Sequence, residues 1–168
     1  GFRTYGFETN LVCVETYRRN LAGKCVHEHL TQQTRYPDAE VVIGGPPCQP
    51  FSVGGNQKGL EDSRDGFPAF IAAVEQLRPY IFLFENVRGL LYRNKWYFEQ
   101  VKSKLEKLDY IVEAQLLNAK HYGVPQNRER VIVVGHRGGF KFPTPHAKVI
   151  SAGTALGSMF EQVPNNAK

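Results

Sequence analysis

The sequence predicts an α/β domain built around a doubly wound, mostly parallel β-sheet. Short apolar runs rich in β-branched residues recur along the chain, and segments in which apolar residues follow helical spacing lie between them. Strands that alternate with helices are typical of parallel sheets with helices packed on their faces. A length of 168 residues suits one domain, so we expect a single domain over residues 1–168.

Five strands are expected, each from a short apolar run. The runs VVI and IFLF are apolar without alternation, as in strands that are covered on both faces. The expected strands are Leu11–Glu15, Val41–Gly44, Tyr80–Glu85, Tyr110–Leu117 and Arg130–Gly135.

Two helices are expected between the later strands, because apolar residues recur there three or four positions apart. The apolar positions of the first helix are Phe67, Phe70, Ile71, Val74 and Leu77. Those of the second helix are Tyr97, Val101, Leu105 and Leu108.

The composition is that of an ordinary globular domain, with 42% hydrophobic and 22% charged residues. No run approaches 18 apolar residues, so we expect no membrane span. The net charge of +5 favours an anionic partner. Three cysteines at irregular spacing do not suggest a disulfide framework, and a reducing cytoplasm fits them better. We expect no metal site, because Cys25, His27 and His29 alternate on one short segment without further ligands.

Cys48 stands in the stretch GGPPCQPFS, directly after the apolar run Val41–Ile43. The prolines on either side fix their own φ angles and push the preceding residues toward extended backbone. A thiol on such a turn at the end of a strand is presented rather than buried. Cys48 is therefore a candidate nucleophile.

A second polar cluster begins at Glu85 and Asn86, which close the following apolar strand. In open α/β sheets, ligands bind at the carboxyl ends of the strands. We therefore expect Cys48 and Glu85 to lie at the same edge of the sheet. Capping or salt bridging remains the alternative role for Glu85.

Three short motifs follow one another at the expected strand edges: PCQ at 47–49, ENV at 85–87 and QNRER at 126–130. Together with EDSR at 61–64, they closely resemble the signature of DNA cytosine-5 methyltransferases in order and spacing. Each tripeptide alone is weak evidence, whereas the three in sequence are strong. The resemblance implies the Rossmann-like fold of S-adenosylmethionine-dependent methyltransferases and a cytoplasmic, nucleoid-associated protein from a bacterial restriction-modification system.

The resemblance implies four catalytic residues. Cys48 would add to carbon 6 of cytosine, which activates carbon 5 toward a methyl group. Glu85 in its protonated form would donate to ring nitrogen 3. Arg128 and Arg130 would hold the base carbonyl and a nearby phosphate, and because they lie two apart at a strand start, their side chains should point the same way. Surface charge is the alternative reading of the two arginines.

The resemblance also implies residues that bind the substrate, which would be duplex DNA with a flipped cytosine. The Pro47 carbonyl would accept from the exocyclic amino group, Ser52 would touch a phosphate, and Asn86 would orient the catalytic loop region. Gln49, which opens the loop 49–59, and Gln126 of the QNRER motif are placed with these residues.

S-adenosylmethionine is the implied cofactor. Glu15, at the end of an expected strand, would accept from the ribose hydroxyls. Phe67 lies near the position that packs on adenine in the family, although its helical spacing favours a core role equally. Gly1 and Phe2 would be the remnant of a glycine-rich turn.

The chain should carry only part of the methyltransferase domain and no target-recognition domain. The first strand and most of the glycine-rich turn are expected before Gly1, and the recognition region after Lys168. Three alternatives stay open: an inactive truncated remnant, one subunit of a split enzyme with a complementing partner, and cytosine-5 methylation of transfer RNA. A pure DNA-binding role is disfavoured because it needs neither Cys48 nor Glu85.

Overall fold

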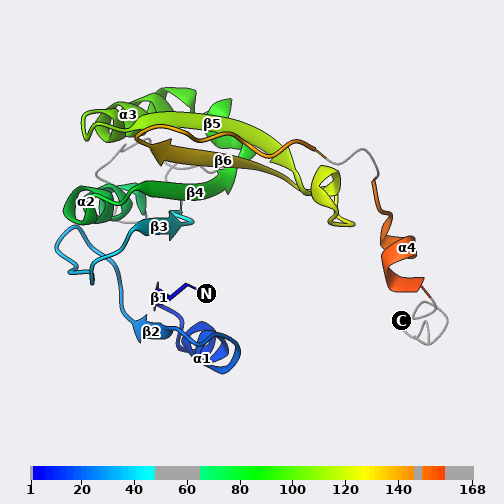
Figure 1. Ribbon diagram of the computed structural model, residues 1–168, viewed down its shortest axis with the longest axis horizontal. Coiled ribbons are helices and arrows are strands. Elements are labelled where there is room, and N and C mark those ends of the chain that lie inside the picture. The colour runs from blue at the N-terminus through cyan, green and yellow to red at the C-terminus, as the bar shows by residue number, and fades with distance from the viewer. Residues whose placement is uncertain (1, 48–64, 146–148, 158–168) are drawn as a thin grey trace.

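The computed structural model describes residues 2–47, 65–145 and 149–157 (Figure 1). It confirms the α/β class, with strands and helices alternating along much of the chain. The elements are β1 (Tyr5–Glu8), α1 (Leu11–Asn20), β2 (Lys24–His27), β3 (Val41–Gly44), α2 (Phe67–Leu77), β4 (Ile81–Val87), the 3-10 helix η3 (Arg88–Leu91), α3 (Lys95–Glu106), β5 (Ile111–Asn118), the 3-10 helix η4 (Ala119–Tyr122), β6 (Glu129–His136) and α4 (Ala152–Leu156).

A four-stranded sheet with the strand order β3-β4-β6-β5 forms the centre of the molecule. β3 is parallel to β4, whereas β6 is antiparallel to both of its neighbours. The sheet is therefore mixed, where the sequence predicted a mostly parallel one. The short connection from β5 to β6 explains the difference, since neighbouring parallel strands need a longer crossover.

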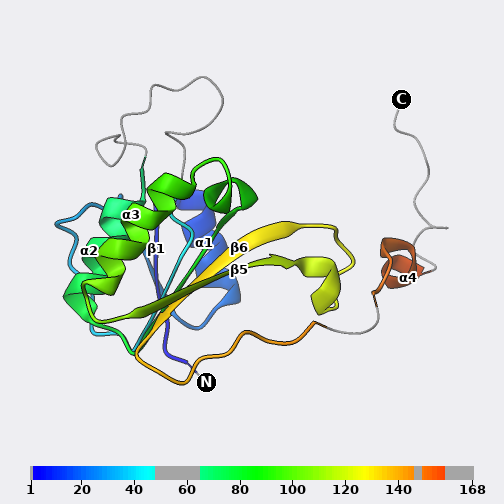
Figure 2. The same ribbon diagram turned by 90° about the horizontal axis from the view of Figure 1, so that it is seen from above.

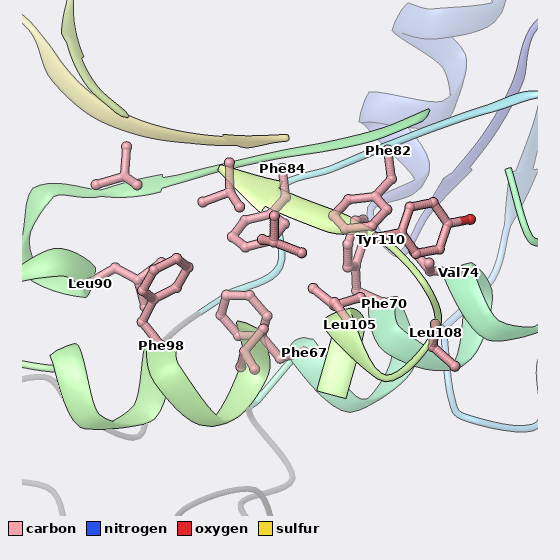
Figure 3. Close-up of a cluster of buried hydrophobic side chains, with 14 of the residues drawn as sticks. Phe67, Phe70, Val74, Phe82, Phe84, Leu90, Phe98, Leu105, Leu108 and Tyr110 are labelled. Atoms are coloured by element: carbon pink, nitrogen blue, oxygen red, sulfur yellow. The ribbon is translucent and has the colours of Figure 1, made fainter. Parts of the chain in front are cut away.

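The hydrophobic core lies between one face of this sheet and the helices α2 and α3, as Figure 3 shows. Phe82 and Phe84 of β4 and Val131 and Val133 of β6 point to this face and are fully buried. Aromatic rings meet edge to face across the layer, with Phe67 of α2 5.2 Å from Phe84 between ring centroids. Such pairs add to the stabilisation that burial itself provides.

The opposite face of the sheet is more open in the described residues. Val41, Ile43, Val87 and Ile111 are between 43% and 74% exposed on it. The two helices that follow β3 and β4 both pack on the buried face. The alternation of side chains along each strand then directs these residues away from the core, although Val134 and His136 of β6 are buried on the same face.

A smaller unit consists of β1, α1 and β2 (Figure 1), in which the two strands are parallel to each other. The expected strand Leu11–Glu15 is wrong, because these residues begin the helix α1. The side chain of Asn10 accepts hydrogen bonds from the backbone N–H groups of Val12 and Cys13 and so caps the helix. Only Val14 of this helix is buried. The helix α4 lies apart from both units in the two views (Figure 1, Figure 2).

The four later strands were predicted correctly, with bounds that differ by at most two residues at each end. Both predicted helices are also present, and Pro68 lies in the first turn of α2, where its missing N–H costs nothing. Within the described part of the chain, no helix is long and apolar enough to cross a bilayer.

Candidate active site

The carboxyl ends of β3 and β4 lie side by side because the two strands are parallel, with Gly44 opposite Phe84. The chain that leaves β3 therefore runs past the last residues of β4. There the side chain of Asn86 donates a hydrogen bond of 2.9 Å to the carbonyl oxygen of Pro46, and Asn86 is buried. Its own oxygen accepts from the backbone N–H of Val87. The ENV motif is thus bonded to the proline turn.

The carbonyl oxygen of Pro47 accepts a hydrogen bond of 3.1 Å from the backbone N–H of Gly66, just before α2. The backbones approach so closely here that a Cβ atom on Gly66 would lie 2.4 Å from Cδ of Pro47. Only glycine fits at such a separation. A carbonyl oxygen has two lone pairs, so Pro47 keeps the capacity to accept a second hydrogen bond.

Glu85 forms an ion pair with Arg130, in which Nε of Arg130 lies 2.6 Å from Oε1 of Glu85. The two residues are diagonal neighbours, because Glu85 faces Ile132 and Arg130 faces Val87 across the antiparallel strands. Their side chains are 41% and 28% exposed, so both remain within reach of a ligand. Glu85 is the acceptor in this pair, and it could donate a proton to a base only after taking one up.

Arg128 is not part of this pair. It precedes β6, which begins at Glu129, and its side chain is exposed. The expectation that the side chains of Arg128 and Arg130 point the same way therefore stays a prediction. The backbone N–H of Arg128 donates to the side chain of Asn118. Gln126 is exposed on the same connection.

Four of the predicted site residues fall outside the described residues: Gly1, Cys48, Gln49 and Ser52. Pro47, the residue bonded to Cys48, is the last described residue before them. The structure therefore describes the chain that leaves β3 up to Pro47, together with the neighbouring end of β4.

The residues predicted for the cofactor do not come together. Glu15 lies on α1 rather than at a strand end, and its carboxylate faces Arg19 at 3.9 Å. Phe67 is fully buried in the core, so its ring has no surface to offer to adenine. Phe2 is 92% exposed. No hydrogen bond, ion pair or ring contact joins these three among the described residues, so the structure adds no support for a shared cofactor site.

Two contacts near the site were not predicted from the sequence. Arg88 pairs with Glu129 at 3.0 Å, which ties the start of η3 to the start of β6. The hydroxyl of Tyr97 on α3 donates to the carboxylate of Asp65. Helical spacing identified Tyr97 as a core residue but gave no partner for its hydroxyl. Asp65, two residues before Phe67, carried a recognisable helix-start signal.

The groups with shifted pKa values lie away from this edge of the sheet. The backbone N–H of Asn10 donates to Glu8 and lowers the pKa of that carboxyl group. Burial raises the pKa of Tyr36 and of Tyr110. Among the described residues, no three His, Cys, Asp or Glu side chains gather in a way that could hold a metal ion.

The family model of the C-5 cytosine-specific DNA methylases matches residues 3–167. The chain belongs to this family. The resemblance seen in the PCQ, ENV and QNRER motifs is thereby confirmed. Methylases of this family depend on S-adenosylmethionine.

Two relatives show how much of such a protein the chain spans. It is 46% identical over 173 residues to the Type II methyltransferase M.AplI of Arthrospira platensis, which covers 100% of this chain and 50% of the relative. It is 36% identical over 160 residues to the Type II methyltransferase M.MthTI of Methanothermobacter thermautotrophicus, covering 90% and 48%. The chain thus spans about half the length of these curated relatives.

Solved structures support the fold. A DNMT2 variant of Spodoptera frugiperda matches with a TM-score of 0.63 and 25% identity over 88% of this chain and 46% of that one. A putative DNA modification methyltransferase encoded within an E. coli prophage matches with a TM-score of 0.72 and 22% identity, over 91% and 47%. The second likeness concerns the fold alone. Both agree with the predicted Rossmann-like α/β class.

Proposed function

We propose that the protein transfers a methyl group from S-adenosylmethionine to carbon 5 of cytosine in duplex DNA. The observation that carries this proposal is the carboxyl edge of β4, where the ENV motif contacts both the proline turn before Cys48 and the QNRER motif. Asn86 of the ENV motif holds the carbonyl of Pro46, next to the PCQ motif, and Glu85 pairs with Arg130 of the QNRER motif. The names of the relatives, which are Type II methyltransferases, favour DNA as the substrate.

Cys48 is the proposed nucleophile. Carbon 5 of cytosine is a poor nucleophile, and addition of a thiolate to carbon 6 forms a carbon–sulfur bond and moves an electron pair toward carbon 5. Covalent addition thus divides one difficult step into two easier ones. After the methyl group has been accepted, loss of the proton from carbon 5 releases the thiolate and restores the aromatic ring.

Glu85 and Arg130 fit the pairing edge of cytosine. Ring nitrogen 3 and the carbonyl at carbon 2 are adjacent acceptors on this base, and a carboxyl group beside a guanidinium offers two adjacent donors. The exocyclic amino group is a donor, and the Pro47 carbonyl oxygen would accept its hydrogen bond through the second lone pair. The same three protein groups would mismatch thymine, whose ring nitrogen 3 is itself a donor.

Arg130 has a second role in this arrangement. It lies 2.6 Å from Glu85 and is held by β6, so it fixes the direction of the carboxyl group. Proton donation by Glu85 would neutralise the negative charge that thiolate addition places on the ring. We assign no residue to the methyl donor, because Glu15, Phe2 and Phe67 do not converge.

The substrate requires that one cytosine leave the DNA stack and enter the site. A net charge of +5 favours contact with the phosphate backbone. Exposed cations lie after η3 at Arg93, at Lys95 in the first turn of α3, and at Arg128 just before β6. We therefore place these cations against the phosphates of duplex DNA.

The proposal is tested by transfer of radioactive methyl groups from S-adenosylmethionine to duplex DNA. The full polypeptide that the gene encodes is used, together with any neighbouring gene product that supplies the half not spanned by this chain. Cys48→Ala is expected to abolish transfer, and Cys13→Ala, which removes an exposed thiol on α1, should leave it unchanged. Glu85→Gln should slow transfer on the order of a hundredfold, the usual range for loss of a general acid.

The same assay separates the alternatives. Transfer to transfer RNA but not to duplex DNA would contradict the proposed substrate. Full transfer by Cys48→Ala would contradict the covalent mechanism.

A further inference from the structure

Tyr97 of α3 is a core residue whose hydroxyl group forms a hydrogen bond outside the core, with Asp65 at the start of α2. Its side chain is fully buried and its ring lies 5.6 Å from that of Phe67, between centroids. A phenylalanine would pack in the same way. The hydroxyl instead donates to Oδ2 of Asp65, at the point where the described chain resumes after Pro47. The contact therefore ties α3 to the start of α2.

Asp65 uses both of its carboxylate oxygens. Oδ1 accepts the backbone N–H of Phe67 at 3.0 Å, which satisfies a free donor at the first turn of α2. Oδ2 accepts from Tyr97. The helix-start role explains one oxygen only, and the bond from Tyr97 holds the carboxylate in a fixed orientation.

The next residue carries this constraint to the proline turn. Gly66 follows Asp65 directly, and its N–H donates to the carbonyl oxygen of Pro47 at 3.1 Å. On the other side, Asn86 donates to the carbonyl of Pro46 at 2.9 Å. The peptide that precedes Cys48 is thus held from two directions, by β4 through Asn86 and by α3 through Asp65 and Gly66.

We propose that Tyr97 and Asp65 are positioning residues for Cys48. This inference rests on the proposed function and deepens it. Pro47 is covalently bonded to Cys48. The hydrogen bond that orients the Pro47 carbonyl therefore also orients the peptide bond that leads into Cys48. The same carbonyl is the proposed acceptor for the cytosine amino group, so its orientation also sets the direction from which the base would be held. Errors of about 1 Å in such alignment can cost on the order of a hundredfold in rate.

The first test compares two buried tyrosines that each lose only a hydroxyl. Tyr97→Phe should lower the single-turnover rate of methyl transfer on the order of tenfold without changing affinity for duplex DNA. Tyr110→Phe is the matched control, because the hydroxyl of Tyr110 donates to Pro79 at the opposite end of β4. It should leave the rate unchanged. Asp65→Asn keeps an acceptor for Phe67 and should retain more activity than Asp65→Ala.

Equal rates for wild type and Tyr97→Phe would overturn the positioning role while leaving the proposed function intact. Equal losses in Tyr97→Phe and Tyr110→Phe would also overturn it, since they would indicate a general effect on the fold.

The second test does not depend on activity. Hydrogen exchange of the Gly66 amide, followed by NMR, reports directly on its bond to Pro47. Tyr97→Phe should speed this exchange, whereas Tyr110→Phe should not. Unchanged exchange at Gly66 would overturn the inference. A wild-type protein that transfers no methyl group would contradict the proposed function itself, whatever the exchange at Gly66 shows.

Discussion

The four-stranded sheet with α2 and α3 is held together differently from the unit formed by β1, α1 and β2. The sheet and its two helices share a continuous core of large aromatic and aliphatic side chains. In the smaller unit, Val14 and Cys25 are the hydrophobic residues that count as buried. Its other contacts are hydrogen bonds near the surface, such as those from Arg18 to the carbonyl of Cys25. The candidate active site therefore rests on the well-packed region.

The largest difference in the free energy of unfolding should appear when one phenylalanine ring is removed from each region. Phe84→Ala deletes a fully buried ring from the sheet and should lower the free energy of unfolding by about 3–5 kcal/mol. Phe7→Ala deletes a partly exposed ring from β1 that meets Tyr36 at 5.2 Å, and it should cost less than half as much. Urea unfolding measures both values. Equal losses would show that the two regions are packed alike.

A smaller effect is expected at the hydroxyl of Tyr110, which donates to the carbonyl of Pro79 in a buried position. Tyr110→Phe leaves that carbonyl without its partner and should cost about 1–3 kcal/mol at neutral pH. Burial raises the pKa of Tyr110 above its ordinary value of 10.0, which means that the folded state favours the neutral phenol.

The sign of the pH dependence follows from this direction. The stability is fully present below the unfolded pKa, near pH 10, and is lost as the pH rises through the folded pKa. When the pH is raised from neutral to above 10, the free energy of unfolding should therefore fall less for Tyr110→Phe than for wild type. Tyr80→Phe, at a residue that is 72% exposed, is the control in urea unfolding at both pH values. A steeper alkaline loss in Tyr110→Phe would contradict the role of burial.

The smallest effect should come from the cap of α1. Asn10→Ala removes the acceptor for the N–H groups of Val12 and Cys13 and should cost about 1 kcal/mol of local stability. Because the smaller unit has little core, hydrogen exchange in α1 should rise more than global unfolding changes. Asn10→Asp retains the acceptor and should behave as wild type. Unchanged exchange in Asn10→Ala would argue against the helix.

The contrast between the two regions also explains what the sequence could predict. The strands β3 and β4 are recognisable because short continuous apolar runs such as VVI and IFLF are flanked by Gly and Pro residues, which favours buried strands over helices. The run Leu11–Val14 is also continuously apolar, but it begins the helix α1 and leaves Leu11 and Val12 more than half exposed. Its apolar residues indicated a strand, whereas the Asn10 side chain caps a helix there. β1 and β2 are four residues each and carry almost no apolar pattern.

The site divides along a similar line. Motif order predicted that Glu85, Asn86 and Arg130 belong to one site, and the structure brings Glu85 and Arg130 into contact beside Asn86. The bond between Tyr97 and Asp65 could not be predicted, since it depends on how α3 packs against the start of α2. The geometry that sets Arg128 apart from Arg130 likewise depends on where β6 begins.

The most direct test of the covalent methyl transfer is trapping on duplex DNA that contains 5-fluorocytosine, in the presence of S-adenosylmethionine. Fluorine at carbon 5 cannot leave as a proton, so the thiolate cannot be released and the adduct persists. We predict one covalent complex, mapped by peptide mass spectrometry to Cys48, absent in Cys48→Ala and formed more slowly in Glu85→Gln. An adduct at Cys13 or Cys25, or none with a protein that binds both DNA and donor, would contradict the account.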